Sequence, residues 1–238
     1  MQIIAHRGNS SACHENTMAA FERAVADGAD GIEFDVRLTS DRQWVVHHDA
    51  DVAIGDRRVP IQSLTLAEVT TARVGPQREP IPRLDDFLLW AREQHVGLIF
   101  DIKDREGIPE LVATVERTGI SNPALYSSFH RSVLKDIESL RPDWPRGLII
   151  GDPRSGLARR FLLGSILRWS SRHRLTSLHI EEHWVVPSAL DKMRAAGLRL
   201  AVWTVDDPLR MTMLAAFGID AVITNKPDLA VTTIRQDR

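Results

Sequence analysis

Chemically reactive side chains stand at the ends of three short apolar runs in this chain of 238 residues. Ile3-Ile4-Ala5 is followed by His6-Arg7-Gly8, Gly31-Ile32 by Glu33-Phe34-Asp35, and Trp44-Val45-Val46 by His47-His48-Asp49. Apolar runs of this length are typical of buried strands. Parallel α/β folds carry their chemistry at the carboxyl ends of such strands. The three runs therefore predict one site that is built from several strand ends.

Glu33 and Asp35 are two residues apart, so both carboxylates point to the same side of a strand. Carboxylates held this close repel each other unless a cation or a shared proton intervenes, and Mg²⁺ or Ca²⁺ prefers such oxygen ligands. Histidine is the side chain that ordinarily exchanges protons near neutral pH, so His6 and His48 are candidate acid–base groups, and Arg7 can form a forked contact with an anion. The set favours metal-assisted chemistry on a phosphate. A hydrogen-bonded core histidine and ordinary ion pairs are the structural alternative.

The same arrangement recurs where the apolar run 98–100 leads into Asp101-Ile102-Lys103. An acid and a base two residues apart share one face of a strand. Asp101 is therefore a candidate third metal ligand and Lys103 a candidate phosphate contact, with a structural ion pair as the alternative. Trp203 ends a later apolar strand and is a candidate to line the pocket, although a core position fits it equally well.

Composition narrows the class of protein. With 43% hydrophobic residues the chain can bury one substantial core, so we expect a single domain over residues 1–238. The net charge of −2 and the lack of a long basic tract argue against a nucleic-acid partner and leave a small anionic substrate compatible. Cys13 is the single cysteine, and no leader segment or apolar stretch long enough to cross a bilayer is visible. We therefore expect a cytoplasmic protein, whose oligomeric state the sequence leaves open.

Hydrophobic periodicity predicts strands and helices in alternation. The predicted strands are residues 3–5, 31–38, 44–46, 98–102, 124–127, 146–150, 175–180, 199–203 and 221–224. The predicted helices are residues 17–26, 64–72, 84–93, 110–117, 132–140, 157–169, 188–196 and 209–217, with Asn16 capping the first.

Alternation of this kind indicates a parallel sheet. With 44–46 counted as a hairpin extension of the second strand, it gives the eight β/α units of a (β/α)8 TIM barrel. Residues 50–83 contain several prolines and predict a small irregular insertion over the site. An open doubly wound sheet is the alternative, but no glycine-rich dinucleotide fingerprint follows the first strand.

Residues 154–174 alternate arginine with large apolar side chains, and no acid lies between Asp152 and Glu181. A basic amphipathic helix of this type is compatible with weak contact to an anionic membrane surface. An ordinary barrel helix with a solvated basic face is the alternative.

The chain resembles the glycerophosphodiester phosphodiesterase family over nearly its whole length. The matching motifs are His6-Arg7-Gly8, Glu15-Asn16-Thr17, Ile32-Glu33-Phe34-Asp35-Val36, Val45-Val46-His47-His48-Asp49, Asp101-Ile102-Lys103, Trp203-Thr204-Val205-Asp206 and Thr224-Asn225-Lys226-Pro227. The resemblance implies a (β/α)8 barrel that hydrolyses glycerophosphodiesters to glycerol 3-phosphate and an alcohol. The chain departs from the family pattern at Asp101, where the family usually has glutamate, and at Asn225, where the family usually has aspartate.

The resemblance also implies a role for each site residue. One Mg²⁺ or Ca²⁺ would be held by Glu33, Asp35 and Asp101, His6 and His48 would serve as general base and acid, and Arg7 with Lys103 would bind the phosphodiester. Two other functions remain open. One is a related lyase that acts on lysophospholipids and releases a cyclic phosphate, and the other is a catalytically silent protein that binds a phosphate ligand.

Overall fold

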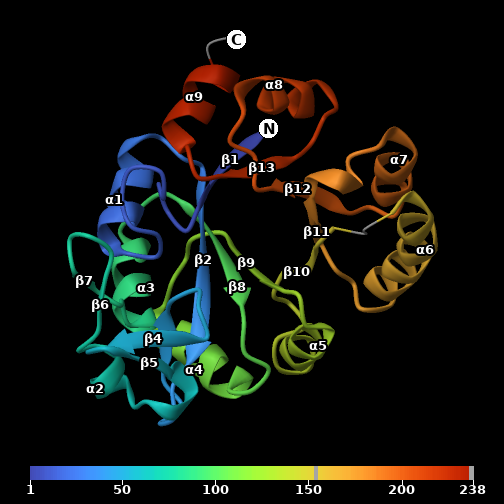
Figure 1. The fold of residues 1–238 in the computed structure, drawn as a ribbon. Helices are drawn as coiled ribbons and strands as arrows, with labels where there is room; N and C mark the ends of the chain where they lie inside the picture. The colour runs from blue at the N-terminus through green and yellow to red at the C-terminus, as the bar shows by residue number, and fades with distance from the viewer. Residues whose placement is uncertain (153–154, 236–238) are drawn as a thin grey trace.

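A closed barrel of eight parallel strands forms the centre of the protein, as expected (Figure 1). The computed structural model describes residues 1–152 and 155–235. The barrel strands are β1 (Gln2–His6), β2 (Gly31–Leu38), β8 (Gly97–Ile102), β9 (Ala124–Ser128), β10 (Arg146–Ile150), β11 (Ser177–Glu181), β12 (Arg199–Trp203) and β13 (Ala221–Thr224). Strand β1 pairs in parallel with both β13 and β2, which closes the barrel.

Helices surround this barrel and run back from the carboxyl end of one strand to the start of the next. They are α1 (Met18–Ala26), α3 (Leu84–Arg92), α4 (Ile108–Thr118), α5 (Arg131–Leu140), α6 (Gly156–Arg172), α7 (Pro187–Ala195), α8 (Pro208–Ala216) and α9 (Pro227–Arg235). Outward side chains of the strands pack under these helices. Phe34 of β2, for example, lies 4.5 Å from Phe87 of α3, measured between ring centroids. Because both strand faces are covered, the strands read as continuous apolar runs rather than as alternating patterns.

The segment between the second and third barrel strands is more regular than the expected loop. Strand β3 (Trp44–Val46) forms the predicted hairpin with β2. Two small hairpins then follow, β4 (Asp51–Ile54) with β5 (Arg57–Pro60) and β6 (Arg73–Val74) with β7 (Glu79–Pro80), separated by the 3-10 turn η1 (Ile61–Ser63) and the short helix α2 (Leu66–Val69). Their apolar side chains gather in a separate small cluster that includes Val52, Ile61 and Val69. Burial of that cluster is why the segment folds despite its weak sequence pattern.

The start of α1 and the presence of α9 differ from the expectation. Helix α1 begins at Met18 and is capped by Thr17, whose hydroxyl accepts a hydrogen bond from the Ala20 amide. Asn16 is not the cap because its side chain is used in the site. Helix α9 was not predicted, although Pro227 stands at its first position, where proline is favoured.

Helix α6 extends from Gly156 to Arg172 and is longer than predicted. Arg154, the first residue of the expected basic segment, lies outside the described residues. Among the residues that the structure describes, none of the helices has both the length and the apolar character that crossing a membrane requires.

Candidate active site

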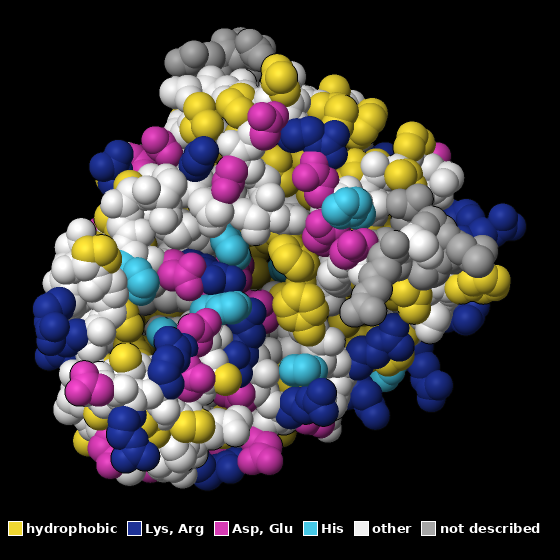
Figure 2. All heavy atoms as spheres, in the orientation of Figure 1, with side chains coloured by type: hydrophobic (Ala, Val, Ile, Leu, Met, Phe, Trp, Pro, Cys, Tyr) yellow, Lys and Arg dark blue, Asp and Glu magenta, His cyan; other side chains and the backbone are white. Residues whose placement is uncertain are grey.

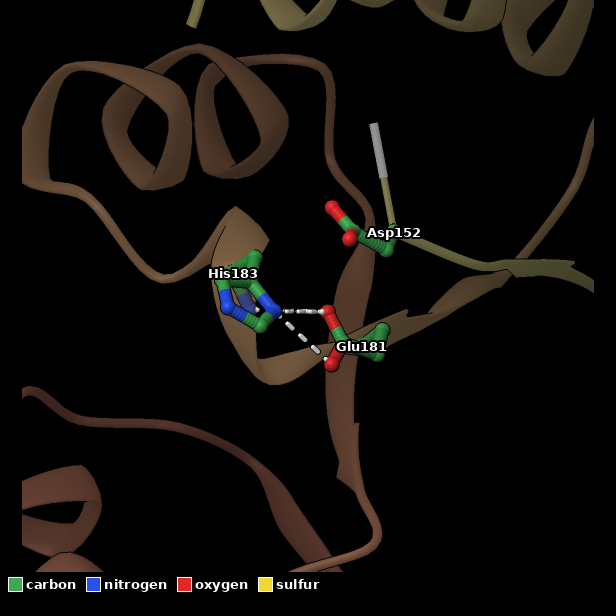
Figure 3. Close-up of side chains that lie close together, drawn as sticks. All are labelled: Asp152, Glu181 and His183. Carbon is green, nitrogen blue, oxygen red and sulfur yellow. Dashed lines mark hydrogen bonds and ion pairs between the residues drawn. The ribbon is translucent and has the colours of Figure 1, made fainter. Parts of the chain in front are cut away.

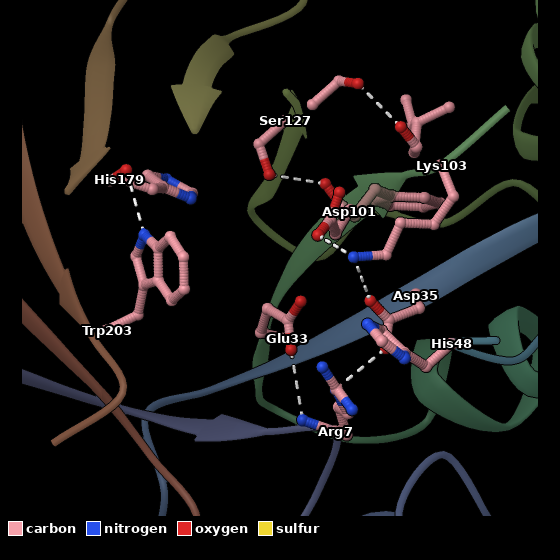
Figure 4. Close-up of polar contacts among 12 residues, drawn as sticks. Arg7, Glu33, Asp35, His48, Asp101, Lys103, Ser127, His179 and Trp203 are labelled. Carbon is pink, nitrogen blue, oxygen red and sulfur yellow. Dashed lines mark hydrogen bonds and ion pairs between the residues drawn. The ribbon is translucent and has the colours of Figure 1, made fainter. Parts of the chain in front are cut away.

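The structure brings the predicted site residues together at the carboxyl ends of the strands. Register pairs His6 with Glu33 across β1 and β2, and Asp35 with Asp101 across β2 and β8. Their side chains meet over the barrel, and His48 joins them from the turn after β3 (Figure 4). Figure 2 shows the same place from outside as a hollow in which acidic, basic and histidine side chains gather. Closure of the barrel therefore unites groups that are far apart in the sequence.

Three buried carboxylates form the centre of this site. Glu33, Asp35 and Asp101 are only 6%, 1% and 4% exposed. Each offers an oxygen, and these oxygens lie within 4.8 Å of one another. Asp101 Oδ1 is buried and accepts no hydrogen bond from any of the described residues. A buried carboxylate oxygen without a partner is costly, so this cluster fits a divalent cation with oxygen ligands.

Arg7 and Lys103 partly offset this negative charge. Arg7 Nε lies 3.0 Å from Asp35 Oδ2, and the other end of the guanidinium donates to Glu15 over 2.8 Å. Lys103 Nζ lies 2.8 Å from Asp35 Oδ1 and 2.5 Å from Asp101 Oδ2. The ammonium group of Lys103 thus lies between two carboxylates.

Burial and charge separate the pKa values of the three acids. Burial, reinforced by the charges of Asp35 and Asp101, raises the pKa of Glu33 well above its ordinary value. Burial likewise raises the pKa of Asp101 to about 6, against the opposing effect of Lys103. For Asp35 burial is outweighed by Lys103 and Arg7, which hold its pKa below the usual range. Glu33 and Asp101 are therefore harder to ionise than free carboxyl groups, and additional positive charge beside them would lower both pKa values.

A chain of hydrogen bonds fixes the orientation of His6. Asn225 Nδ2 donates to Asp206 over 2.7 Å, so Asn225 Oδ1 is the atom that faces His6 Nδ1, at 2.7 Å. Since an amide oxygen only accepts, Nδ1 must carry the proton, and the unprotonated Nε2 faces Glu33, 4.0 Å away. Burial, followed by the charge of Arg7, lowers the pKa of His6. A neutral imidazole with a free Nε2 can act as a general base.

His48 stands at the more open edge of the site, with 37% of its side chain exposed. Its Nδ1 lies 3.0 Å from Asp49 Oδ1, and its backbone oxygen accepts hydrogen bonds from the guanidinium of Arg37. Arg37 is in turn paired with Asp104. These contacts hold the turn that presents the imidazole to the site.

Trp203 lines the mouth of the barrel at the end of β12. Its indole Nε1 donates to the backbone oxygen of His179 over 3.0 Å, and its ring meets Phe129 edge to face at 5.8 Å. The Lys103 ammonium lies 5.7 Å from the centre of the Phe129 ring. The two aromatic rings form an apolar wall beside the charged groups.

Sequence reasoning missed four supporting residues, namely Asn16, Arg37, Asp206 and Asn225. Asn16 and Asp35 exchange two hydrogen bonds, from Asn16 Nδ2 to Asp35 Oδ2 at 2.7 Å and from the Asp35 amide to Asn16 Oδ1 at 3.2 Å. The signal that could have found two of them was their position in the sequence, because Asn225 directly follows β13 and Asp206 lies shortly after the end of β12.

A second group with possible ligand atoms lies on the rim, at Asp152, Glu181 and His183 (Figure 3). His183 Nδ1 lies 2.8 Å from Glu181 Oε2, and this contact raises the pKa of His183. Asp152 and His183 are exposed. The cluster has the character of a surface ion pair and not of a buried metal site.

Comparison with known proteins identifies the family. The model of the glycerophosphoryl diester phosphodiesterase family matches residues 6–229. The chain belongs to this family. The glycerophosphodiester phosphodiesterase of Caldanaerobacter subterraneus subsp. tengcongensis is 30% identical, with 98% of each chain aligned.

Solved phosphodiesterases have the same fold. A phosphodiesterase of Oleispira antarctica, determined in complex with its product sn-glycerol-3-phosphate, superposes with a TM-score of 0.87 at 26% identity and covers 99% of this chain and 97% of its own. The glycerophosphodiester phosphodiesterase of Agrobacterium tumefaciens has a TM-score of 0.82 at 25% identity, covering 98% and 99% of the two chains. The protein is thus a phosphoric diester hydrolase with a TIM barrel, and its reaction is glycerophosphodiester hydrolysis, as expected.

Proposed function

We propose that this phosphodiesterase requires a divalent cation, held by Glu33, Asp35 and Asp101, and releases glycerol 3-phosphate from glycerophosphodiesters. The observation that supports this most directly is the burial of three acids, with Asp101 Oδ1 left without a hydrogen-bond partner among the described residues. A bound Mg²⁺ or Ca²⁺ would supply positive charge beside the phosphoryl oxygens, where negative charge increases during the reaction. The product bound to the Oleispira antarctica relative agrees with a substrate of this class.

The protein side chains have distinct tasks in this proposal. Arg7 and Lys103 bind the phosphodiester, since both are cations at the edge of the acidic cluster. His6 Nε2 accepts the proton of the attacking hydroxyl, and its neutral state is favoured by burial. His48, near the mouth, donates a proton to the departing alcohol. Trp203 and Phe129 contact the part of the substrate that lies away from the phosphate.

A cation held by Asp35 and Asp101 would compete with Lys103 for the carboxylate oxygens that it now contacts. Lys103 would then be available to bind the phosphate. Asp101 is one methylene, or roughly 1.5 Å, shorter than the glutamate usual in the family. We propose that it reaches the cation directly because Asp101 Oδ1 has no other partner among the described residues.

The test is release of glycerol 3-phosphate from glycerophosphocholine with EDTA and after return of Mg²⁺ or Ca²⁺. We expect EDTA to abolish release and either ion to restore it, and we expect Glu33→Gln to lower kcat at least about 10³-fold. Glu22→Gln, on the exposed side of α1, is the matched control and should leave kcat unchanged. Full activity of Glu33→Gln, or of the chelated protein, would contradict the proposal.

Two alternative outcomes have their own measurement. A cyclic phosphate that persists in the phosphorus NMR spectrum would identify the lyase, and binding without turnover would identify a silent binder. The positioning of His6 by Asn225 argues against a protein that binds its ligand without turnover, because such a protein needs no oriented base.

Weak contact with a membrane surface remains a separate proposal for α6. Phe161 and Leu162 near its start are 74% and 47% exposed, next to the exposed Arg160. Such a patch would favour lysophospholipids over water-soluble diesters. Flotation with vesicles of phosphatidylglycerol tests it, and equal recovery with phosphatidylcholine vesicles would remove the role of anionic lipid.

A further inference from the structure

A cavity of about 560 Å³ lies in the barrel at the end opposite the active site. Its rim is formed by residues at or just before the strand starts, including Asp30, Arg199 and Asp220. The interior of a (β/α)8 barrel is normally filled by layers of branched side chains. Here the wall includes Gly97, Ala201 and Ala221, which leave that space open.

The depth of the cavity is visible in the exposure of inward side chains. Ile99 and Leu125 line it and are only half-buried, although they belong to the central strands β8 and β9. Ile4, Ala201 and Ala221 pack around the same space in a cluster separate from the layer under the helices. The wall is therefore mostly apolar.

One polar pair lies at the inner end. His179 is 2% exposed, and its Nε2 lies 3.4 Å from Ser177 Oγ. Gly147 leaves room for it, because a Cβ there would lie 2.6 Å from Ser177 Oγ and 3.2 Å from His179 Nε2. Burial lowers the pKa of His179 to about 4, so the ring is neutral near pH 7 and adds no charge to the interior.

The charges are confined to the rim, and Arg199 is the cation available there. Asp30 accepts from the Ile3 amide and pairs with Arg235, and Asp220 accepts from the Leu200 amide. Arg199, with 63% of its side chain exposed, donates to Gln2 and has only a 4.0 Å contact with Asp220. An anionic group at the rim would find a partner in Arg199.

We propose that this cavity binds a medium-chain alkyl carboxylate, with the hydrocarbon tail inside the barrel and the carboxylate at Arg199. A mostly apolar pocket of this size with few polar groups is typical of a small-molecule site. One apolar chain with one charged end matches a cavity that is apolar inside and charged only at its mouth.

The chemistry of the substrate supports this class of ligand. A glycerophosphodiester carries free hydroxyls where a membrane phosphodiester carries acyl esters. The class of reaction that supplies it is therefore ester hydrolysis, which releases alkyl carboxylates together with the substrate. A site for such a carboxylate would link the enzyme to the reaction that supplies its substrate.

The experiment is calorimetric titration of the whole chain with decanoate below its critical micelle concentration. We expect one saturable site per chain, and we expect Ala201→Leu, which fills the cavity, to weaken binding at least about tenfold. Ala216→Leu, the control, introduces the same side chain at an exposed position of α8 and should bind decanoate as strongly as the unmodified protein does. Release of glycerol 3-phosphate at the normal rate shows that each variant is folded.

The role of Arg199 is tested with ligands that have the same alkyl tail and differ in the charge of their polar end. Arg199→Gln should weaken decanoate several-fold and leave decanol unchanged. Absence of saturable decanoate binding, or equal binding by Ala201→Leu, would overturn the proposal, as would tighter binding of decyltrimethylammonium than of decanoate. If Ala201→Leu does not fold, Ala221→Val is the smaller replacement in the same wall. The binding measurements do not depend on the metal or on the roles of His6 and His48.

Discussion

At the scale of single residues, Lys103 shows how the site tolerates its own charge. Three buried acids without counterions would be strongly unfavourable. In the protein without a bound metal ion, the ammonium of Lys103 between Asp35 and Asp101 offsets part of this cost. The raised pKa of Glu33 shows that the compensation is incomplete. A divalent cation would complete the charge compensation. The same side chains would then contribute both to the stability of the protein and to its activity.

Asn225 gives a test of how His6 is positioned. Asn225→Ala removes the oxygen that accepts from Nδ1, so the ring loses its fixed tautomer and orientation. We expect kcat to fall about 10²-fold with KM little changed. Asn225→Asp, which keeps an acceptor oxygen, should recover most of kcat. A change confined to KM would show that Asn225 contacts substrate instead.

His179 predicts a pH dependence of stability. Its pKa is lowered to about 4 in the folded protein, while an unfolded histidine titrates near 6.5. The unfolded state therefore binds the proton first, and stability from this group is complete above pH 6.5 and is lost as the pH falls toward 4. Between pH 7 and pH 5 we expect the protein to lose about 2 kcal/mol relative to His179→Gln.

Urea unfolding at the two pH values measures this loss. The comparison with the variant is needed because Glu33 and Asp101, whose pKa values are raised, have the opposite effect and favour the folded state in acid. An identical pH response of the two proteins would exclude a neutral buried His179.

At the scale of elements, the connection from β1 to α1 is the most constrained part of the site. It carries Arg7 and Asn16 in left-handed conformations, each with φ of 56°, and Gly8 with φ of 83°. A Cβ at Gly8 would lie 2.6 Å from the backbone of Ala20 in α1. This close approach lets the helix support the strand end that presents His6.

Gly8→Ala should therefore lower the free energy of unfolding by about 2 kcal/mol or more, since neither backbone can yield easily. Gly55→Ala is the matched control, because Gly55 also has positive φ but no atom lies within 4 Å of its added Cβ. The control should cost about 1 kcal/mol. Equal losses in chemical unfolding would mean that backbone strain, and not contact with α1, explains the glycine.

At the scale of the whole molecule, binding of the proposed cation would be coupled to the stability of the barrel. The acids come from β2 and β8, which are neighbours in the sheet, and β2 also joins β1 where the barrel closes. A ligand at this place stabilises the folded state by mass action. At a concentration of about 100 Kd, Mg²⁺ or Ca²⁺ should raise Tm by about 5–10 °C.

Scanning calorimetry with and without EDTA checks this shift. The double variant Glu33→Gln, Asp35→Asn lacks two of the proposed ligands and should show no response to either ion. A response of the same size in the double variant would place the cation elsewhere on the protein.

The sequence by itself determined the parallel barrel and indicated which strand-end residues the barrel brings together. Hydrophobic periodicity is a local property of the sequence, and so is the spacing of two between Glu33 and Asp35 and between Asp101 and Lys103. On a strand this spacing directly places both side chains on the same face. The order of strands and helices followed for the same reason, and the boundaries of most elements agree within a few residues.

Only the tertiary structure decided which distant groups meet. Asn225 reaches His6 across 219 positions because β13 pairs with β1 when the barrel closes. Lys103 lies between two carboxylates because the buried negative charge of Asp35 and Asp101 favours a cation beside it. The cavity beside His179 likewise depends on small residues from several strands meeting in one layer. Local periodicity contains no information on such pairings, since it does not measure what lies across the barrel.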